Sequence, residues 1–193
     1  MRPQLGRDKI LKAAVHLFAK AGYHSTSVGQ IALAASVSKG LMYNYFNSKD
    51  ALLLAIVDDA SQQMFALAEG LTDSDAAKPG SHAEVLRRFL DGLGANLREN
   101  GSQLSFQLSL LHQPDLKPIV EIPFRERGEK LLAMTTMMFV RAGAPDANLT
   151  ARRFITEIDG IALHYLSIFA DYPLDAMLEN VFQNYKDMRS EPL

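Results

Sequence analysis

The segment TSVGQIALAASVSKGLMYNYFNSKDALLL, from Thr26 to Leu54, contains start signals for three helices in close succession. Ser27 is a good N-cap residue, and Gln30 three positions later completes a capping box, so a helix is expected to begin there. After a short turn, Ser38 caps a second helix that is expected to extend to about Phe46. The spacing predicts a helix-turn-helix followed by a third helix.

The second of these helices has a small apolar face and a larger polar one. Met42 and Phe46 are four positions apart and are expected to face inward together. The other faces are left to Lys39, Gly40, Leu41, Tyr43, Asn44 and Tyr45. Two tyrosines and an asparagine on an exposed helix face are typical of a helix that reads the major groove of DNA.

Composition places the chain among soluble globular proteins. It has 193 residues, 48% of them hydrophobic, and no cysteine, so no disulfide frame or thiol chemistry exists, and a cytoplasmic location is expected. The first nine residues, MRPQLGRDK, lack the apolar segment expected of a secretory signal peptide. The longest apolar runs fall short of the roughly 20 residues needed for a membrane span, so no membrane partner is expected.

The charge is distributed unevenly along the chain. Residues 1–50 contain seven basic and two acidic side chains, a net charge of +5, whereas the remainder contains 13 basic and 20 acidic side chains, a net charge of −7. The positive charge therefore lies in the segment that contains the helix-turn-helix, which favours DNA as its partner.

The rest of the chain predicts more helices and no strands. An amphipathic helix beginning near Ile10 is closed by Gly22, and a longer one runs from Asn47 or Ser48 to about Gly70. A polar connector, residues 71–81, ends in a second capping box, Ser81 with Glu84. Further helices are expected at residues 81–99, 102–112, 119–141, 149–170 and 174–188, with Pro123 tolerable only near a helix start. The predicted fold class is all-α.

The sequence closely resembles the TetR family of transcriptional regulators. The resemblance rests on GY-x-x-TSV from Gly22, A-x-VSKG from Ala35 and YNYF-x-SK from Tyr43, all in register, and covers roughly the first quarter of the chain. It implies an N-terminal three-helix DNA-binding domain, residues 1–50, and a C-terminal helical domain for ligand binding and dimerisation, residues 51–193.

Two positions depart from the family pattern. Ser36 occupies a turn position that is usually glycine, so it has to accept or avoid a left-handed backbone at some cost. Leu41 replaces a smaller residue, and its side chain either contacts a thymine methyl group or packs on the first helix. Both departures affect the expected operator sequence rather than the fold.

The resemblance assigns roles on the DNA-binding surface. Phosphate contacts are implied for Thr26, Ser27, Tyr43, Tyr45 and Lys49. Base contacts are implied for Lys39, Gly40, Leu41 and Asn44. Ser38, the cap of the second helix, is also assigned to the DNA-binding surface. The chemistry agrees, because lysine suits guanine, asparagine suits adenine, and tyrosine hydroxyls suit phosphate. The alternative is that the tyrosines only pad a small core, which is more plausible for Tyr45 than for Tyr43.

Central helices rich in methionine and phenylalanine are candidates for a cavity that binds a small-molecule effector. The expected lining residues are Phe89, Leu93, Phe106, Leu110, Met134, Met137, Met138, His164 and Phe169. The alternative is that they form the hydrophobic core, as methionine and phenylalanine at helical spacing most often do.

The last two predicted helices are candidates for a homodimer interface, because their apolar stripes are wide for the end of a small domain. The expected residues are Phe154, Ile158, Ile161, Tyr165, Met177, Leu178, Val181, Phe182 and Tyr185, with Gly160 and Ala162 permitting close helix approach. The resemblance implies pairing of two C-terminal helices from each chain, and two-fold symmetry suits a palindromic operator.

Nothing in the sequence indicates catalysis. The five histidines lack metal-site spacing, no phosphate loop or nucleophile elbow occurs, and Asp58 and Asp59 point to different helix faces. No catalytic residue, metal or cofactor is therefore expected.

The predicted function is a ligand-responsive DNA-binding regulator, a repressor released by a small molecule. Two rivals are a small-molecule-binding protein with a vestigial DNA module and an all-α enzyme, which metal analysis would test. The effector, the operator and the regulated genes are not encoded in any motif.

Overall fold

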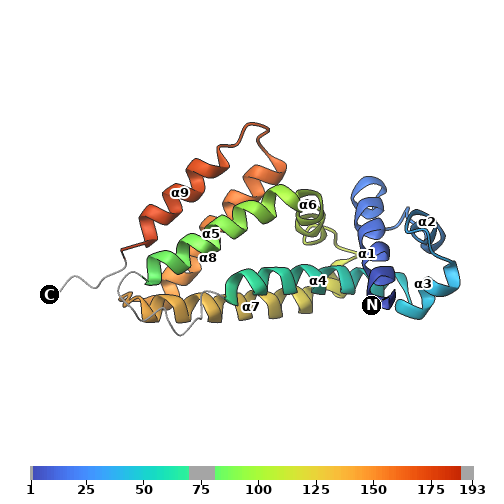
Figure 1. Cartoon of the computed structure of the whole chain (residues 1–193), viewed down its shortest axis with the longest axis horizontal. Helices are drawn as coiled ribbons and strands as arrows, with labels where there is room; N and C mark the ends of the chain where they lie inside the picture. The colour runs from blue at the N-terminus through green and yellow to red at the C-terminus, as the bar shows by residue number, and fades with distance from the viewer. Residues whose placement is uncertain (1, 70–80, 188–193) are drawn as a thin grey trace. The chain divides into compact units, whose positions relative to one another are not determined.

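The structure, a computed structural model, describes residues 2–69 and 81–187. Within these ranges the chain forms helices and no strand, which confirms the all-α prediction (Figure 1). The helices are α1 (Arg2–Ala21), α2 (Val28–Ala34), α3 (Lys39–Tyr45), α4 (Lys49–Glu69), α5 (Ser81–Glu99), α6 (Gly101–Leu110), α7 (Lys117–Arg141), α8 (Ala147–Ser167) and α9 (Leu174–Tyr185). The predicted connector up to residue 80, the capping side chain of Ser81 and the predicted helix end at Met188 lie outside what the structure describes.

The helices pack into two compact units. The first contains the chain up to Ala60 together with Ser102–Phe124, and the second contains Ser61–Gly101 and the chain from Arg125 onward. The expected division at residue 50 concerns function and stays a prediction. Packing divides the chain ten residues later, within α4, and adds α6 and the start of α7 to the first unit.

The first unit has a core built around α1. Phe18 is 2% exposed, and its ring centroid lies 5.0 Å from that of Tyr23 and 5.8 Å from that of Phe106 on α6. Leu110, fully buried, belongs to the same core. Phe106 and Leu110 were expected to line an effector cavity. They instead belong to the core of the first unit, where Phe106 packs on Phe18 of α1.

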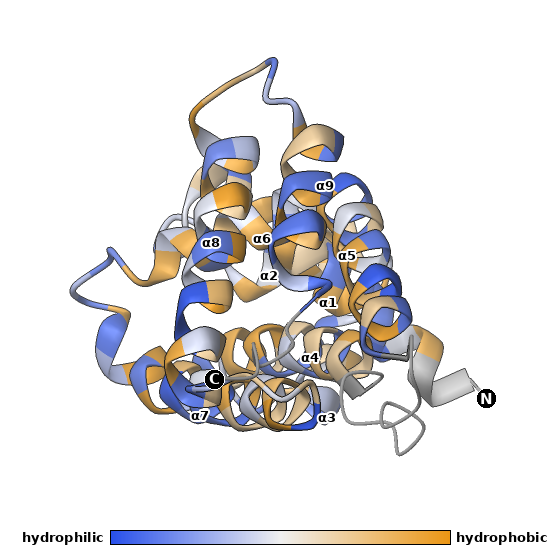
Figure 2. Cartoon of the chain, turned by 90° about the vertical axis from the view of Figure 1, so that its left-hand side faces the viewer, coloured by the Kyte–Doolittle hydropathy of each residue, from blue (hydrophilic) through white to orange (hydrophobic). Residues whose placement is uncertain are grey.

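The second unit has a core of aromatic rings from four helices. Phe139 of α7 and Phe154 of α8 make an edge-on contact with centroids 5.6 Å apart, and Tyr185 of α9 contacts Phe154 at 5.1 Å. Phe89 of α5 closes the cluster at 5.9 Å from Phe154. Apolar and polar residues alternate along these helices (Figure 2), so each buries one face.

Two helices contain features that bear on earlier expectations. Pro123 lies inside α7, in its second turn, and so near its start as expected. Residues Lys49–Ala68 of α4 are long and apolar enough to cross a membrane by length and composition. Within this helix, Leu52, Leu53 and Ile56 are fully buried.

Candidate nucleic-acid interface and ligand cavity

The two helices of the helix-turn-helix begin at side-chain caps. Ser27 accepts a hydrogen bond from the backbone N–H of Gln30, whose side chain accepts in return from the Ser27 N–H at 2.7 Å. Ser38 accepts from the backbone N–H of Leu41 at 3.0 Å. Both predicted caps are therefore confirmed, and they fix where α2 and α3 begin.

The turn between these helices has an unusual backbone. Ser36 has a φ of 56°, the left-handed region, and no other non-glycine residue among those described has a positive φ. The N–H of Val37 bonds to the carbonyl of Ala32, and the N–H of Ser36 bonds to that of Leu33. This is a Schellman ending, which normally places glycine where Ser36 lies. Ser36 thus accepts the strain that the sequence predicted.

The outward face of α3 carries chemically varied side chains on a rigid base. Met42 is 1% exposed, whereas Leu41 is 38% and Tyr43 44% exposed. Lys39 and Asn44 are exposed as well. A Cβ atom on Gly40 would meet nothing within 4 Å, so the space in front of this turn is open. Leu41 therefore presents part of its side chain to solvent on this face.

Tyr45 lies differently from Tyr43. It is partly buried against the core of the first unit, and its hydroxyl oxygen lies 3.0 Å from the position that a Cβ atom on Gly6 would take. The ring of Tyr45 therefore serves mainly as a packing residue between α3 and α1.

Thr26 does not offer its side chain to a phosphate, which corrects the expected role. It is 2% exposed, and its hydroxyl donates to the carbonyl of Gly22 at 2.9 Å. Because that carbonyl follows the last turn of α1, Thr26 closes the helix end instead.

Lys49 and Asp50 tie the start of α4 to the loop before α2. Lys49 Nζ donates to the carbonyl oxygens of Tyr23 at 3.0 Å and Thr26 at 3.1 Å, and it lies 4.3 Å from the centre of the Tyr23 ring. The Tyr23 hydroxyl donates to Asp50. Burial, followed by the bond to Asp50, raises the pKa of Tyr23 well above its usual value. Two of the three Lys49 donors are thus used within the unit.

Comparison with known proteins decides which family this arrangement represents. The model for "Bacterial regulatory proteins, tetR family" matches residues 10–56, the span that contains the caps, the turn and α3. Residues 10–56 therefore match the TetR family of transcriptional regulators, as the sequence resemblance predicted.

Relatives and solved structures agree with the TetR assignment. The HTH-type transcriptional regulator YuxN of Bacillus subtilis is 36% identical over 99 residues, 51% of this chain and 33% of that protein. The alignments with the first three relatives span about a third of each relative's length. BetI of Escherichia coli O127:H6, also an HTH-type transcriptional regulator, is 28% identical over 91% of both chains.

The fold of the TetR family extends over nearly the whole chain. A TetR transcription regulator from Haloarcula marismortui superimposes with a TM-score of 0.71 and 21% identity, covering 93% of each chain. Such low identity shows the shared fold alone.

The second unit contains a cavity among four helices. Its lining is Met64 and Ala68 of α4, Phe89 of α5, Leu131 and Thr135 of α7, and Phe154, Ile155, Ile158 and Asp159 of α8. The cavity measures about 50 Å³. Asp159 is its one charged lining residue and is exposed, whereas Phe154 and Thr135 are buried.

Of the expected lining residues, Phe89 alone borders this cavity. Leu93 and Met138 are 2% and 1% exposed and belong to the packed core. Met137 is 47% and Phe169 51% exposed. His164 packs edge-on against Phe169 and Tyr172, while Met134 is half-buried. The expected set therefore does not form one cavity, because helical spacing does not distinguish a core face from a cavity face.

Asp159 was not among the expected site residues, although the sequence contains a signal for it. Asp159 comes directly after Ile158 and four residues after Ile155, so it places a charge beside the buried stripe of an amphipathic helix. A carboxylate at such a position needs a partner or a function. Although the residue as a whole is exposed, desolvation of its carboxyl group by the surrounding protein raises the pKa of Asp159, and the positive charge of Arg127 acts in the opposite direction.

Most residues expected at a dimer interface are buried within the chain itself, which corrects that expectation. This applies to Phe154, Ile158, Ile161, Leu178, Val181 and Tyr185, each at most 8% exposed. Their stripes pack between α5, α8 and α9. Tyr165, Met177 and Phe182 stay half-buried, and Phe182 lies beneath the Arg87 guanidinium at 3.6 Å. The wide stripes are explained by packing inside the unit.

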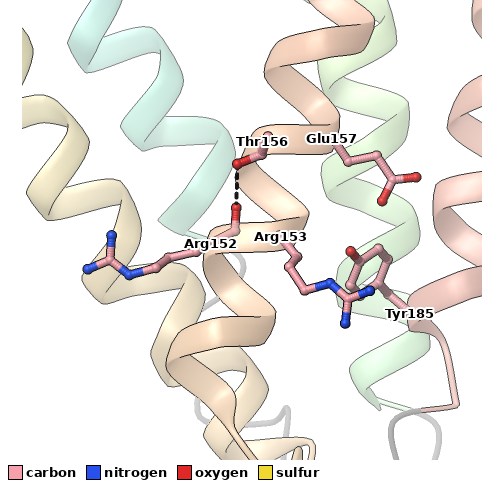
Figure 3. A pocket seen from close by; sticks show the side chains of 5 residues that line it. All are labelled: Arg152, Arg153, Thr156, Glu157 and Tyr185. Atoms are coloured by element: carbon pink, nitrogen blue, oxygen red, sulfur yellow. Dashed lines mark hydrogen bonds between the residues drawn. The ribbon is translucent and has the colours of Figure 1, made fainter.

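A shallow surface hollow accompanies the α8 and α9 pair. In Figure 3, Arg153 and Glu157 extend toward Tyr185 while Arg152 points away from it. Thr156 donates to the Arg152 carbonyl at 2.8 Å. Burial and Glu157 raise the pKa of Tyr185 to about 12. The hollow is polar and open, unlike the cavity near Asp159.

Proposed function

We propose that this TetR-family regulator is a repressor that binds double-stranded DNA through α3. The observation that carries the proposal is the exposed face of α3, with Lys39, Leu41, Tyr43 and Asn44 on a helix whose start and end are fixed. Lysine suits guanine edges and asparagine suits adenine edges. The net charge of +5 in residues 1–50 supports the same partner.

Backbone contacts complete the proposed interface. Ser27 and Tyr43 are exposed and suit phosphate oxygens. Lys49 contributes its third N–H, since lysine has three donors and two are already used. Tyr45 contributes only the part of its ring and hydroxyl that packing on α1 leaves accessible.

The test for DNA binding begins with selection of an operator from random duplexes. Binding of the selected duplex is then measured by gel shift at fixed salt for Lys39→Ala and Tyr43→Phe. We expect each variant to bind at least threefold more weakly. The matched control for the tyrosine is Tyr165→Phe on α8, which should bind as the parent chain does. If no sequence is enriched, the strained Ser36 and the unusual Leu41 favour the rival, a small-molecule-binding protein with a vestigial DNA module.

The regulator is proposed to act as a homodimer on a palindromic operator, because a single helix-turn-helix makes few contacts and two-fold symmetry matches two half-sites. The supporting feature is the outer face of α8. Gly160 has no neighbour within 4 Å of a Cβ position in its own chain, and Leu163 one turn later is 41% exposed. A small residue beside an exposed leucine permits close approach of a second helix.

Release from DNA is proposed to follow binding of a small molecule in the cavity of the second unit. Met64 and Ala68, which line the cavity, belong to α4, and the first turn of α4 holds the loop before α2. An effector can act only through unequal affinity for the bound and released states. The regulator is proposed to work in the cytoplasm, where its DNA lies.

A further inference from the structure

The cavity of the second unit has an uneven chemistry. Its walls include the rings of Phe89 and Phe154 and the aliphatic side chains of Leu131 and Ile155. Two polar residues interrupt this surface, the buried Thr135 and the exposed Asp159. A molecule entering the cavity therefore meets apolar contacts on most sides and one carboxylate.

The Asp159 carboxylate at the cavity favours a ligand with a positive charge. Arg127 interacts electrostatically with Asp159, but it is not among the residues that line the cavity. The lining therefore presents a carboxylate but no cationic side chain to a ligand. A cation gains attraction to Asp159, and the faces of aromatic rings also attract cations.

The volume of the cavity limits the size of the chemical group that it can hold. One water requires roughly 10–15 Å³ of such volume, so about 50 Å³ accommodates a group of a few non-hydrogen atoms. Met64 is unbranched and adaptable, which lets the wall yield to a longer apolar substituent.

We propose that the cavity binds small organic cations, an ammonium group on a short apolar chain, with Asp159 as its counter-ion. This inference names the effector class of the function proposed above and rests on it only for the regulatory consequence. Binding itself requires no DNA.

The experiment uses the full chain and three probes of nearly equal size: propylammonium, propanol and propionate. Binding is followed by chemical shifts of isoleucine and methionine methyl groups. We expect propylammonium to saturate with a dissociation constant on the order of millimolar. It should bind at least tenfold more tightly than propanol, and propionate should not bind.

Two variants assign the effect to one carboxylate. Asp159→Asn keeps the shape of the side chain and should bind propylammonium no better than propanol. Glu157→Gln removes the same charge from the same helix outside the cavity and should retain the tenfold preference. Equal binding of the three probes, an unchanged preference in Asp159→Asn, or no binding at all would overturn the inference.

A separate measurement isolates the regulatory consequence. Affinity for the selected operator is compared with and without saturating propylammonium at constant ionic strength. If the cation binds at Asp159 but leaves DNA affinity unchanged, the cavity inference stands and the proposed release mechanism fails.

Discussion

Helices α3 and α8 use their apolar residues in contrasting ways. The seven-residue α3 buries only Met42 and displays nearly everything else. The 21-residue α8 buries Ala151, Phe154, Ile158 and Ile161 and also borders a cavity and an open surface. A short helix with a single buried residue leaves little choice about which face points inward. A long amphipathic helix can direct each apolar residue to its own core, a ligand or a partner, and its sequence alone does not choose.

The largest expected effect tests whether the α8 stripe is core. Phe154→Ala removes a fully buried ring that contacts three other rings, so the free energy of unfolding should fall by about 3–5 kcal/mol in urea denaturation. Leu163→Ala, on the exposed face of the same helix, should cost less than about 0.5 kcal/mol. A similarly small loss in the free energy of unfolding for both variants would place Phe154 at the dimer interface rather than in the core.

The next effect tests the outer face of α8. Gly160→Leu meets no neighbour in its own chain, so the fold should persist while close approach of a second copy is blocked. Sedimentation should show monomers, and operator affinity should fall by roughly a hundredfold, about 2.7 kcal/mol. Gly128→Leu on α7 is the control, because Gly128 is equally free of neighbours. A dimeric Gly160→Leu variant would place the interface on another surface.

A smaller effect concerns the turn that orients α3. Ser36→Gly relieves a left-handed backbone and should raise the free energy of unfolding by about 1 kcal/mol in thermal or urea denaturation. Ser36→Ala keeps the Cβ atom and should give no gain. An equal gain from alanine would mean that the hydroxyl, and not the backbone, carries the cost.

The smallest effect tests how α3 reads bases. If Leu41 contacts a thymine methyl group, replacing that thymine by deoxyuridine in the selected operator should weaken binding roughly threefold, about 0.7 kcal/mol. The Leu41→Ala variant should bind both duplexes equally in the same gel shift. Continued discrimination by Leu41→Ala would transfer the methyl contact to another residue.

The same contrast explains what the sequence could predict. Caps at Ser27 and Ser38, the strained turn at Ser36 and the burial of Met42 are local, because each depends on residues within a few positions. Hydrogen bonds of this kind are visible as short sequence patterns. The exposure of Leu41 required the structure, since both packing and display were compatible with its position.

Long-range packing explains what the sequence could not predict. Phe106 pairs with Phe18, 88 positions earlier in the chain, so nothing near α6 indicates that it packs on α1. Phe154 and Tyr185 likewise form a contact that their own helices do not reveal. Asp159 was visible as an acid beside an apolar stripe, but only the arrangement of four helices places it at a cavity.

The Lys49 ammonium group has a consequence for how motion could reach DNA. It joins the first turn of α4 to the carbonyl of Thr26, the residue immediately before the cap of α2. If α4 slides or rotates by more than a hydrogen bond can stretch, the start of α2 must follow it or two bonds to Lys49 must break. Small displacements of α4 would therefore carry the start of α2 with them, whereas larger ones would cost the two hydrogen bonds of Lys49.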